Sequence, residues 1–349
     1  MSLNTFTYTK NFKLESGRHF AGLQVAYHTF GKLNANKSNV IWVCHALTAN
    51  SDVLDWWAGL FGENNLFNPT EHFIVCANVL SSPYGTTNPL STDPETGQPY
   101  YQNFPQVTIR DMVKAHILLA DDLGIENIKV LIGGSLGGQQ ALEWSIIQPE
   151  RIEHSVLIAS NAKHSPWGIA LNESQRLAIS ADPTFYSGKA DGGSNGLKAA
   201  RSIALLSYRS YLTYDVTQQD NNDELLDGYK AASYQSYQGD KLIKRFNAYS
   251  YWHLSKAMDS NNVGRCRESV EAALELVKAK TLVIGITSDI LFPVTEQQYL
   301  AKHIPNATYV EYDSIYGHDS FLVETETLTK IIDTFLGDIS GKIIKLHTA

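Results

Sequence analysis

The amino-acid sequence predicts an α/β fold: a mostly parallel sheet flanked by helices, with a helical cap inserted between two strands. Short β-branched runs alternate with helical patterns, which is typical of strands joined by crossover helices. The later runs are almost continuously apolar, as expected for strands covered on both faces. The alternation stops after residue 162 and resumes near Thr281. The order of the elements therefore predicts both the sheet and the insertion.

The predicted strands cover residues 25–30, 39–47, 72–80, 128–135, 154–160, 280–286 and 307–313. The predicted core helices cover residues 109–125, 138–150, 295–304 and 326–339. Helical patterns without a strand run cover residues 171–180, 196–212, 223–237 and 239–259. We interpret residues 1–162 and 277–349 as the core domain and residues 163–276 as a cap over the carboxyl ends of the strands. A separate helical domain with its own partner is the alternative, but the return of the chain to the same sheet favours a cap.

Composition and charge exclude several classes of protein. Hydrophobic residues make up 43% of the 349 residues and charged residues 18%, which is enough apolar side chain for a large ordered core. The net charge of −8 and the scattered lysines and arginines argue against a nucleic-acid or anionic-membrane partner. The sequence has no signal-peptide pattern and no apolar run of the roughly 20 residues that span a bilayer. We expect a cytoplasmic protein whose three cysteines, Cys44, Cys76 and Cys266, are buried free thiols and not disulfides or zinc ligands.

Residues 131–144, LIGGSLGGQQALEW, place one serine between a predicted strand and a predicted helix. Gly133, Ser135 and Gly137 fit the pattern G-x-S-x-G, which in this context predicts a nucleophile elbow. The turn leaves no room for side chains two positions from the serine, and the serine backbone is expected to be strained. A structural turn or a phosphate-binding turn is the alternative. A dinucleotide-binding motif fits poorly, however, and the lysine of a P-loop is missing.

A serine nucleophile needs a base, and the base needs a carboxylate that orients it. In the α/β-hydrolase fold the acid and then the histidine follow the serine, each in a loop after a late strand. Asp289 is the first acid after strand 280–286, and His318 lies in the loop after strand 307–313. We therefore predict Ser135, Asp289 and His318 as the catalytic residues. A helix N-cap is the alternative role for Asp289.

Other acids and histidines fit this order less well. Asp313 ends the wrong strand, and His45 precedes the serine. His303 lies in a helical pattern, and His347 lies in the C-terminal tail.

Two backbone N–H groups are predicted to form an oxyanion hole. Leu136 follows the serine at a helix N-terminus, where the helix dipole favours negative charge. The second donor usually comes from the loop after the third strand, and residues 45–48, HALT, end such a strand. Leu47 is the predicted donor in that loop.

Many ordered segments resemble the homoserine O-acetyltransferases of the α/β-hydrolase superfamily, over about residues 12–335. They are LESG (14–17), VAYHTFGKLN (25–34), HALT (45–48), NVL (78–80), YGTTNP (84–89), FPQVTIRDMV (104–113), GGSLGGQQALEW (133–144), RSIALLSYRS (201–210), GDKLIKRFNAYSYWHLSKAMD (239–259), SDILFP (288–293) and GHDSFL (317–322). So many segments in one order are far more specific than the elbow alone.

The resemblance implies transfer of an acetyl group from acetyl-CoA to the hydroxyl of L-homoserine, in methionine biosynthesis, through an acyl-serine. It implies that Arg201 holds the homoserine carboxylate, that Tyr208 is its hydrogen-bonding neighbour, and that Asp319 binds the ammonium group. A zwitterion needs one fixed cation and one fixed anion, which suits this set. From the residues alone, Arg201 reads instead as a solvated helix charge. The resemblance also implies a homodimer, and the sequence shows no site for a metal or for an organic cofactor beyond the co-substrate acetyl-CoA.

Two loops differ from the common pattern of this family. Ala49 and Asn50 follow HALT where the family commonly has glycine, and residues 81–83, SSP, follow NVL where glycines and a cysteine are common. Both loops border the serine, so succinyl-CoA stays open as an alternative acyl donor and serine as an alternative acceptor. An esterase on the same triad is a further alternative, and a non-catalytic binding module is the alternative outside enzymes.

Overall fold

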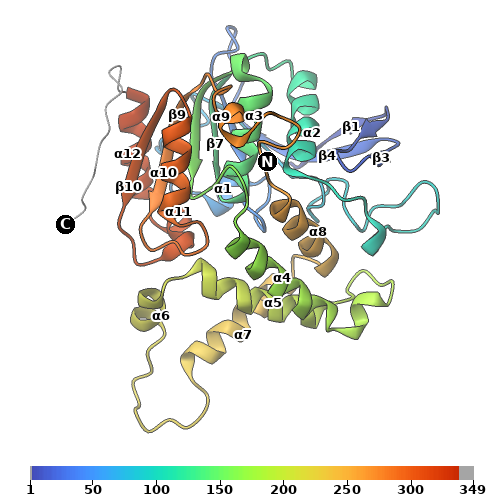
Figure 1. Cartoon of the computed structure of the whole chain (residues 1–349), viewed down its shortest axis with the longest axis vertical. Helices are drawn as coiled ribbons and strands as arrows, with labels where there is room; N and C mark the ends of the chain where they lie inside the picture. Colours follow the sequence, from blue (N-terminus) through green and yellow to red (C-terminus); the bar gives the residue numbers. More distant parts are fainter. Residues whose placement is uncertain (1, 338–349) are drawn as a thin grey trace.

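The computed structural model describes residues 2–337 and has the predicted α/β architecture (Figure 1). One 8-stranded sheet runs in the order β1-β4-β6-β5-β7-β8-β9-β10. Its parallel strands are β5 (Val40–Cys44), β6 (Phe73–Ala77), β7 (Ile128–Gly134), β8 (Ile152–Ile158), β9 (Lys280–Ile286) and β10 (Ala307–Tyr312). At one edge, β4 (Leu23–Phe30) pairs antiparallel with β6 and with β1 (Asn4–Tyr8). The prediction of a mostly parallel sheet is therefore confirmed.

Strand β1 was not predicted. It is an edge strand whose residues alternate between half-buried and exposed, so it contains no apolar run. A separate short hairpin, β2 (Phe12–Lys13) and β3 (His19–Phe20), follows it along the chain.

Alternate residues of the parallel strands enter two different hydrophobic cores. Trp42 and Cys44 of β5 belong to the core that includes residues of α2 (Ile109–Asp122), α3 (Leu136–Ile147) and α10 (Val294–His303). Ile41 and Val43 belong to the other core, with residues of α1 (Val53–Trp56), α11 (Ser320–Val323) and α12 (Thr325–Gly337). Both faces are covered, which is why these strands are almost continuously apolar. The predicted helix 326–339 corresponds to α12, and its last two residues lie outside the described range, as does His347.

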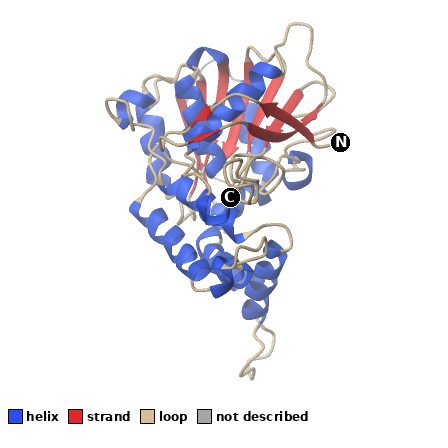
Figure 2. Cartoon of the chain, turned by 90° about the vertical axis from the view of Figure 1, so that its right-hand side faces the viewer, coloured by secondary structure: helices blue, strands red, loops and turns tan. Residues whose placement is uncertain are grey.

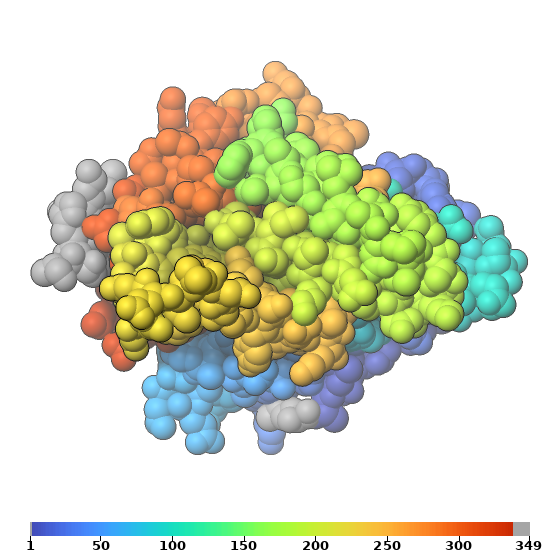
Figure 3. All heavy atoms as spheres, turned by 90° about the horizontal axis from the view of Figure 1, so that it is seen from below, coloured from blue at the N-terminus to red at the C-terminus, as the bar shows by residue number. Residues whose placement is uncertain are grey.

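The chain between β8 and β9 forms a series of helices. Figures 1 and 2 show most of them as a lobe on one side of the sheet, whereas the last and shortest lies apart from the lobe and contacts α10. The helices are α4 (Pro166–Ser180), α5 (Ser194–Tyr208), α6 (Tyr211–Thr217), α7 (Lys230–Ile243), α8 (Ala248–Asp259) and α9 (Val270–Leu274). Helix α4 packs on α5 and α8, and α5 packs on α7. Seen from below, this segment spreads across the middle of the face (Figure 3). The division into a core domain and a cap at residues 163 and 276 stays a prediction.

The prediction of one helix over 196–212 is wrong. Helix α5 ends at Tyr208, and Arg209 has an extended backbone with φ −113° and ψ 148°. Ser210 then begins α6 as its N-cap, because its Oγ accepts a hydrogen bond from the Thr213 N–H at 3.1 Å. This break turns Arg209 out of the helix, with consequences for the site described below.

Two other helical patterns differ from the structure in a similar way. Within 239–259, α7 ends at Ile243 and Asn247 caps α8, with its Oδ1 accepting from the Ser250 N–H at 2.8 Å. Within 223–237, the helix begins only at Lys230, after a glycine, Gly228, with φ 76°. Serine, asparagine and glycine favour helix boundaries. These residues therefore indicated the helix ends, although the apolar spacing alone continued past them.

Two of the three cysteines are buried, as predicted. Cys44 and Cys76 lie inside adjacent strands of the sheet, whereas Cys266 is exposed, contrary to the prediction. Cys266 lies in a turn between α8 and α9, with φ 58°, and is not part of a strand. Within residues 2–337 no helix is long and apolar enough to cross a membrane.

Replacing Asn247 should test the break between α7 and α8. Asn247→Ala should lower the free energy of unfolding by about 1 kcal/mol, because the first turn of α8 loses its capping acceptor. Asn247→Asp keeps the acceptor and should stay close to wild type. Denaturant unfolding of the three proteins measures this difference, and equal losses in both variants would contradict a capping role.

Candidate active site

Ser135 occupies the turn between β7 and α3, with φ 57° and ψ −125°. Residues other than glycine rarely adopt this backbone conformation, so the backbone of Ser135 is strained. A Cβ on Gly133 would lie 2.3 Å from the carbonyl carbon and oxygen of Gly137. A Cβ on Gly137 would lie 2.1 Å from the carbonyl oxygen of Cys44. Both positions therefore require glycine, and the predicted elbow geometry is present.

The elbow is attached to the end of the neighbouring strand β8. The Ser135 N–H donates to the Ile158 carbonyl at 3.0 Å, and the Ser160 hydroxyl donates to the Ser135 carbonyl at 3.0 Å. Ser135 is 6% exposed. These bonds fix the serine at the carboxyl ends of the parallel strands, where open α/β sheets bind their ligands.

The loops after β9 and β10 bring Asp289 and His318 together. His318 Nδ1 lies 2.6 Å from Asp289 Oδ2. The second carboxylate oxygen, Oδ1, accepts hydrogen bonds from the N–H groups of Leu291 at 2.8 Å and Phe292 at 2.9 Å. The carboxylate is thus held at both oxygens, and the imidazole is oriented with Nε2 free for the serine.

His318 is packed among aromatic rings. Phe292 stacks on it at 5.2 Å between ring centroids, and Phe321 meets it edge-on at 5.4 Å. Burial acts to lower the pKa of His318, but the charge of Asp289, its hydrogen bond and the charge of Asp319 outweigh burial. The net result is a pKa raised above the ordinary value of histidine.

A glycine places the His318 loop against the segment between α5 and α6. Gly317 has φ 64°, and a Cβ there would lie 2.8 Å from the Ser210 nitrogen and 3.0 Å from the Tyr208 carbonyl oxygen. The loop and the break between α5 and α6 therefore touch backbone to backbone. This contact sets Tyr208 at 5.9 Å from His318 between ring centroids.

Most of the predicted site residues line one pocket of about 450 Å³. They are Leu47, Ser135, Arg201, Tyr208, His318 and Asp319. Asp289 lies behind His318 and is 4% exposed. In the part of the chain that the structure describes, the Ser135 hydroxyl makes no hydrogen bond to His318. Such bonds commonly tighten only when substrate is bound.

The two candidate oxyanion donors come from two different segments that meet near the serine. Leu136 is the first residue of α3, and Leu47 follows the end of β5. Neither N–H donates a hydrogen bond within residues 2–337, so both are free for an oxyanion. The preceding loop residue, His45, is 0% exposed and holds this loop in place: its Nδ1 lies 2.8 Å from the Ala46 carbonyl, and its Nε2 accepts from the Val79 N–H at 3.1 Å.

Burial lowers the pKa of His45 to about 4, so this histidine is a neutral structural group and not the base. Asp313 is exposed, and His303 packs on Tyr299 of its own helix. Neither lines the pocket of Ser135.

Three of the charged residues of the pocket, Arg201, Arg209 and Asp319, contact neighbouring side chains. The Arg201 guanidinium carbon lies 5.3 Å from the centre of the Tyr208 ring, as a cation–π contact. Asp319 Oδ2 lies 2.8 Å from Arg209 Nε. Arg209 was not among the predicted site residues, because the helical pattern over 196–212 places it inside a continuous helix. The Ser210 N-cap is the signal that would have placed Arg209 outside that helix.

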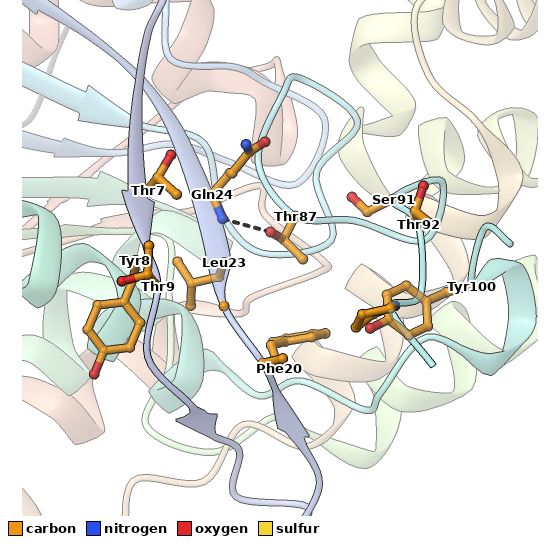
Figure 4. Close-up of a pocket in the computed structure, with 13 residues that line it drawn as sticks. Thr7, Tyr8, Thr9, Phe20, Leu23, Gln24, Thr87, Ser91, Thr92 and Tyr100 are labelled. Atoms are coloured by element: carbon orange, nitrogen blue, oxygen red, sulfur yellow. Dashed lines mark hydrogen bonds between the residues drawn. The ribbon is translucent and has the colours of Figure 1, made fainter. Parts of the chain in front are cut away.

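Two further features of the described residues were possible sites: a group of metal ligands and the pocket at the β1–β4 edge. Among residues 2–337, no group of three His, Cys, Asp or Glu side chains is placed to hold a metal ion. A pocket at the β1–β4 edge is lined by Thr7, Phe20 and Tyr100 among others, and there the Gln24 N–H donates to Thr87 Oγ1 at 2.9 Å (Figure 4). Its lining residues carry no charge at neutral pH.

Comparison with known proteins identifies the fold and the family. The family profile described as the alpha/beta hydrolase fold matches residues 39–325. Homoserine O-acetyltransferase of Cyclobacterium marinum is 48% identical over 341 residues, covering 98% of this chain and 97% of that protein.

The chain belongs to the homoserine O-acetyltransferase family. Members of this family are acyltransferases on the α/β-hydrolase fold. Two solved structures confirm the fold. One is homoserine O-acetyltransferase from Bacillus anthracis, with a TM-score of 0.89 and 24% identity over 98% of this chain and 99% of that chain. The other is esterase E22, with a TM-score of 0.87 and 23% identity over 96% of this chain and 99% of that chain.

Changing Asp319 should move the pH dependence of serine acylation. Asp319 raises the pKa of His318, so Asp319→Asn should lower that pKa. Only the neutral imidazole accepts a proton, so the acid limb of the rate profile should shift to lower pH. Burst kinetics with p-nitrophenyl acetate measure the shift, and Asp55→Asn, another carboxylate of the pocket, is the control. An unchanged acid limb in Asp319→Asn would contradict this electrostatic coupling.

A buried glutamate behind the site should make stability depend on pH. Glu296 Oε2 accepts from Asn161 Nδ2 at 2.9 Å, and Asn161 Oδ1 accepts from Gln139 of α3 at 2.9 Å. Burial raises the pKa of Glu296 to about 7, against the opposing hydrogen bonds from Asn161 and Ser165 and with a further increase from the charge of Asp289.

Folding raises the pKa of Glu296, so the folded protein holds this proton more tightly than the unfolded chain does. The contribution of Glu296 to the free energy of unfolding is therefore fully present below pH 4.5 and is lost as the pH rises through about 7. Glu296→Gln keeps an acceptor for Asn161 but cannot ionise. Its free energy of unfolding relative to wild type should therefore increase by about 1–2 kcal/mol between pH 5 and pH 8, allowing for partial exposure. Denaturant unfolding at several pH values measures this change, and parallel profiles of the two proteins would refute it.

Proposed function

We propose that this protein transfers an acetyl group from acetyl-CoA to the side-chain hydroxyl of L-homoserine through an acetyl-serine intermediate. The observation that supports the proposal most is the shared pocket: Ser135 and His318 line it together with Arg201 and Asp319. A nucleophile, its base, a cation and an anion thus face one cavity. The 48% identity to the Cyclobacterium marinum homoserine O-acetyltransferase supports the same reaction.

In the first half-reaction, Ser135 Oγ attacks the thioester carbonyl carbon while His318 Nε2 takes the hydroxyl proton. The N–H groups of Leu47 and Leu136 donate to the oxyanion that forms. The tetrahedral intermediate collapses, the carbon–sulfur bond breaks, and His318 gives its proton to the sulfur of CoA. Asp289, whose Oδ2 lies 2.6 Å from His318 Nδ1, orients the imidazole for these proton transfers.

In the second half-reaction, homoserine enters the same pocket. Arg201 binds its carboxylate, Tyr208 lies beside Arg201, and Asp319 binds its ammonium group. Asp319 Oδ2 already contacts Arg209, whereas Oδ1 accepts no hydrogen bond within the described range and is available to the ligand. His318 removes the proton of the homoserine hydroxyl, which attacks the acetyl carbonyl, and Ser135 leaves with that proton.

An esterase on the same residues is the second candidate, since esterase E22 shares the fold with a TM-score of 0.87. Both reactions pass through an acyl-serine and differ only in whether water or homoserine attacks it. The pocket favours transfer, because hydrolysis uses neither a fixed cation nor a fixed anion for a zwitterionic acceptor.

We further propose that the protein is a homodimer. Helices α5 to α7 expose several large apolar side chains, which a second copy of the chain would cover. They include Leu206, Tyr211, Leu212, Val216 and Tyr237.

Ser135→Ala should abolish the reaction. Formation of O-acetylhomoserine and release of CoA should both fall by about 10⁴-fold or more, because the acyl group has no carrier. Product analysis by mass spectrometry, together with a thiol assay for CoA, measures both. Retained acetyl transfer in this variant would overturn the mechanism.

The wild-type protein supplies the control. It should release CoA rapidly only when homoserine is present, and rapid release without an acceptor would favour the esterase. The same assay with succinyl-CoA or with serine identifies the donor and the acceptor.

A further inference from the structure

The pocket of Ser135 carries positive charge, although the whole chain has a net charge of −8. Its cationic lining residues are Arg201, Arg209, Lys241 and Arg245, and its acidic ones are Asp55 and Asp319. A cavity whose charge is opposite to that of the protein concentrates anions at its entrance. With four cations and two acids in its lining, this pocket suits a ligand that carries more negative charge than a single carboxylate.

Two of these cations have no role in the reaction described so far. Arg209 is paired with Asp319 at 2.8 Å, and Arg201 lies on Tyr208, where it serves the acceptor carboxylate. Lys241 and Arg245 are exposed and form no ion pair with a carboxylate anywhere in residues 2–337. The nearby acid Asp240 is already paired with Lys198 at 2.8 Å.

Arg245 is held in one orientation by the loop that follows β5. Its Nη1 donates to the Thr48 carbonyl and to the Tyr84 hydroxyl. Thr48 directly follows Leu47, the candidate oxyanion donor. The remaining N–H groups of Arg245, on Nε and Nη2, have no partner among the described residues, so a planar fork of donors is left for a ligand.

We propose that Lys241 and Arg245 form a phosphate-binding subsite at the rim of the pocket, which holds the phosphorylated nucleotide half of an acyl-CoA donor. This subsite rests on the proposed function, because it assumes a CoA thioester as the donor. Homoserine is too small and too weakly charged to require it, since Arg201 already matches its one carboxylate.

Ser135 is buried, whereas Lys241 and Arg245 are exposed, and this difference agrees with a donor whose thioester lies deep and whose phosphates lie at the surface. Ser135 is 6% exposed, so the donor must enter the pocket with its uncharged end, which carries the thioester, in order to reach the serine. Phosphates are strongly hydrated and remain at the rim, where Lys241 and Arg245 are exposed. Arginine binds phosphate through two parallel N–H groups, and lysine adds a mobile point charge.

The test compares a phosphorylated donor with one that lacks phosphate. The variants are Lys241→Gln, Arg245→Gln and the double variant. Lys244→Gln is the matched control, because Lys244 is an exposed cation at the end of the same helix but does not line the pocket. The donors are acetyl-CoA and S-acetylpantetheine, each assayed with saturating homoserine.

The double variant should lose about ten-fold in kcat/KM for acetyl-CoA, as expected for two exposed ion pairs. Its kcat/KM for S-acetylpantetheine and its kcat at saturating acetyl-CoA should remain at the wild-type level. The control Lys244→Gln should match wild type with both donors. An equal loss with both donors would show that Arg245 only braces the loop at Thr48, and an unchanged kcat/KM for acetyl-CoA would show that phosphate binds elsewhere; either result overturns the subsite.

Calorimetric binding of free CoA and of pantetheine separates this inference from the proposed reaction. The wild type should bind CoA more tightly than pantetheine, and the double variant should bind the two alike. If the wild type transfers no acetyl group yet shows this difference, the reaction is wrong and the subsite holds. If it transfers acetyl normally and the difference persists in the double variant, the subsite is wrong and the reaction holds.

Discussion

The strained backbone of Ser135 is the constraint on which the rest of the site depends. A φ of 57° at a serine costs about 1–3 kcal/mol, and only a rigid surrounding can maintain it. The rigidity comes from the parallel pairing of β5, β7 and β8, which places Cys44 opposite Gly133 and brings the Ser135 N–H to Ile158. Glycine at positions 133 and 137 is the condition for this close approach. The turn then leaves the hydroxyl at the N-terminus of α3 and above the sheet.

A second requirement is that a buried histidine remains basic. Burial alone would lower the pKa of His318, and a neutral, weakly basic imidazole would accept the serine proton poorly. Asp289, held by two backbone N–H groups, restores the basicity through a bond of 2.6 Å. Asp319 acts in the same direction from the pocket side. Asp319 therefore raises the pKa of the base, and it is also the residue that we propose for the acceptor ammonium group.

The scaffold itself does not select between transfer and hydrolysis, since a homoserine O-acetyltransferase and an esterase superpose on it almost equally well, with TM-scores of 0.89 and 0.87. The two classes of protein must therefore differ in the residues that line the pocket, and several of these come from the helices between β8 and β9. Helices α5 and α7 supply Arg201, Tyr208 and Lys241, and the segment before α8 supplies Arg245. These segments thus bring cations to the pocket of Ser135 in a protein of net negative charge, which suits the anionic and zwitterionic substrates that we propose.

The sequence by itself determined the α/β class, the elbow and the positions of Ser135, Asp289 and His318, because periodicity, glycine spacing and strand order are local or topological properties. It did not determine the edge strand β1, whose half-buried residues have no apolar run, or the exposure of Cys266. It also missed Arg209, since the break after α5 depends on one N-cap serine and on packing against Gly317. Only the tertiary structure decided which charges meet in the pocket, because Arg209, Asp319 and Arg245 find their partners across segments that are distant in the chain. Ion pairs and pKa shifts arise from such distances and from burial, and neither is encoded in the spacing of residues along the sequence.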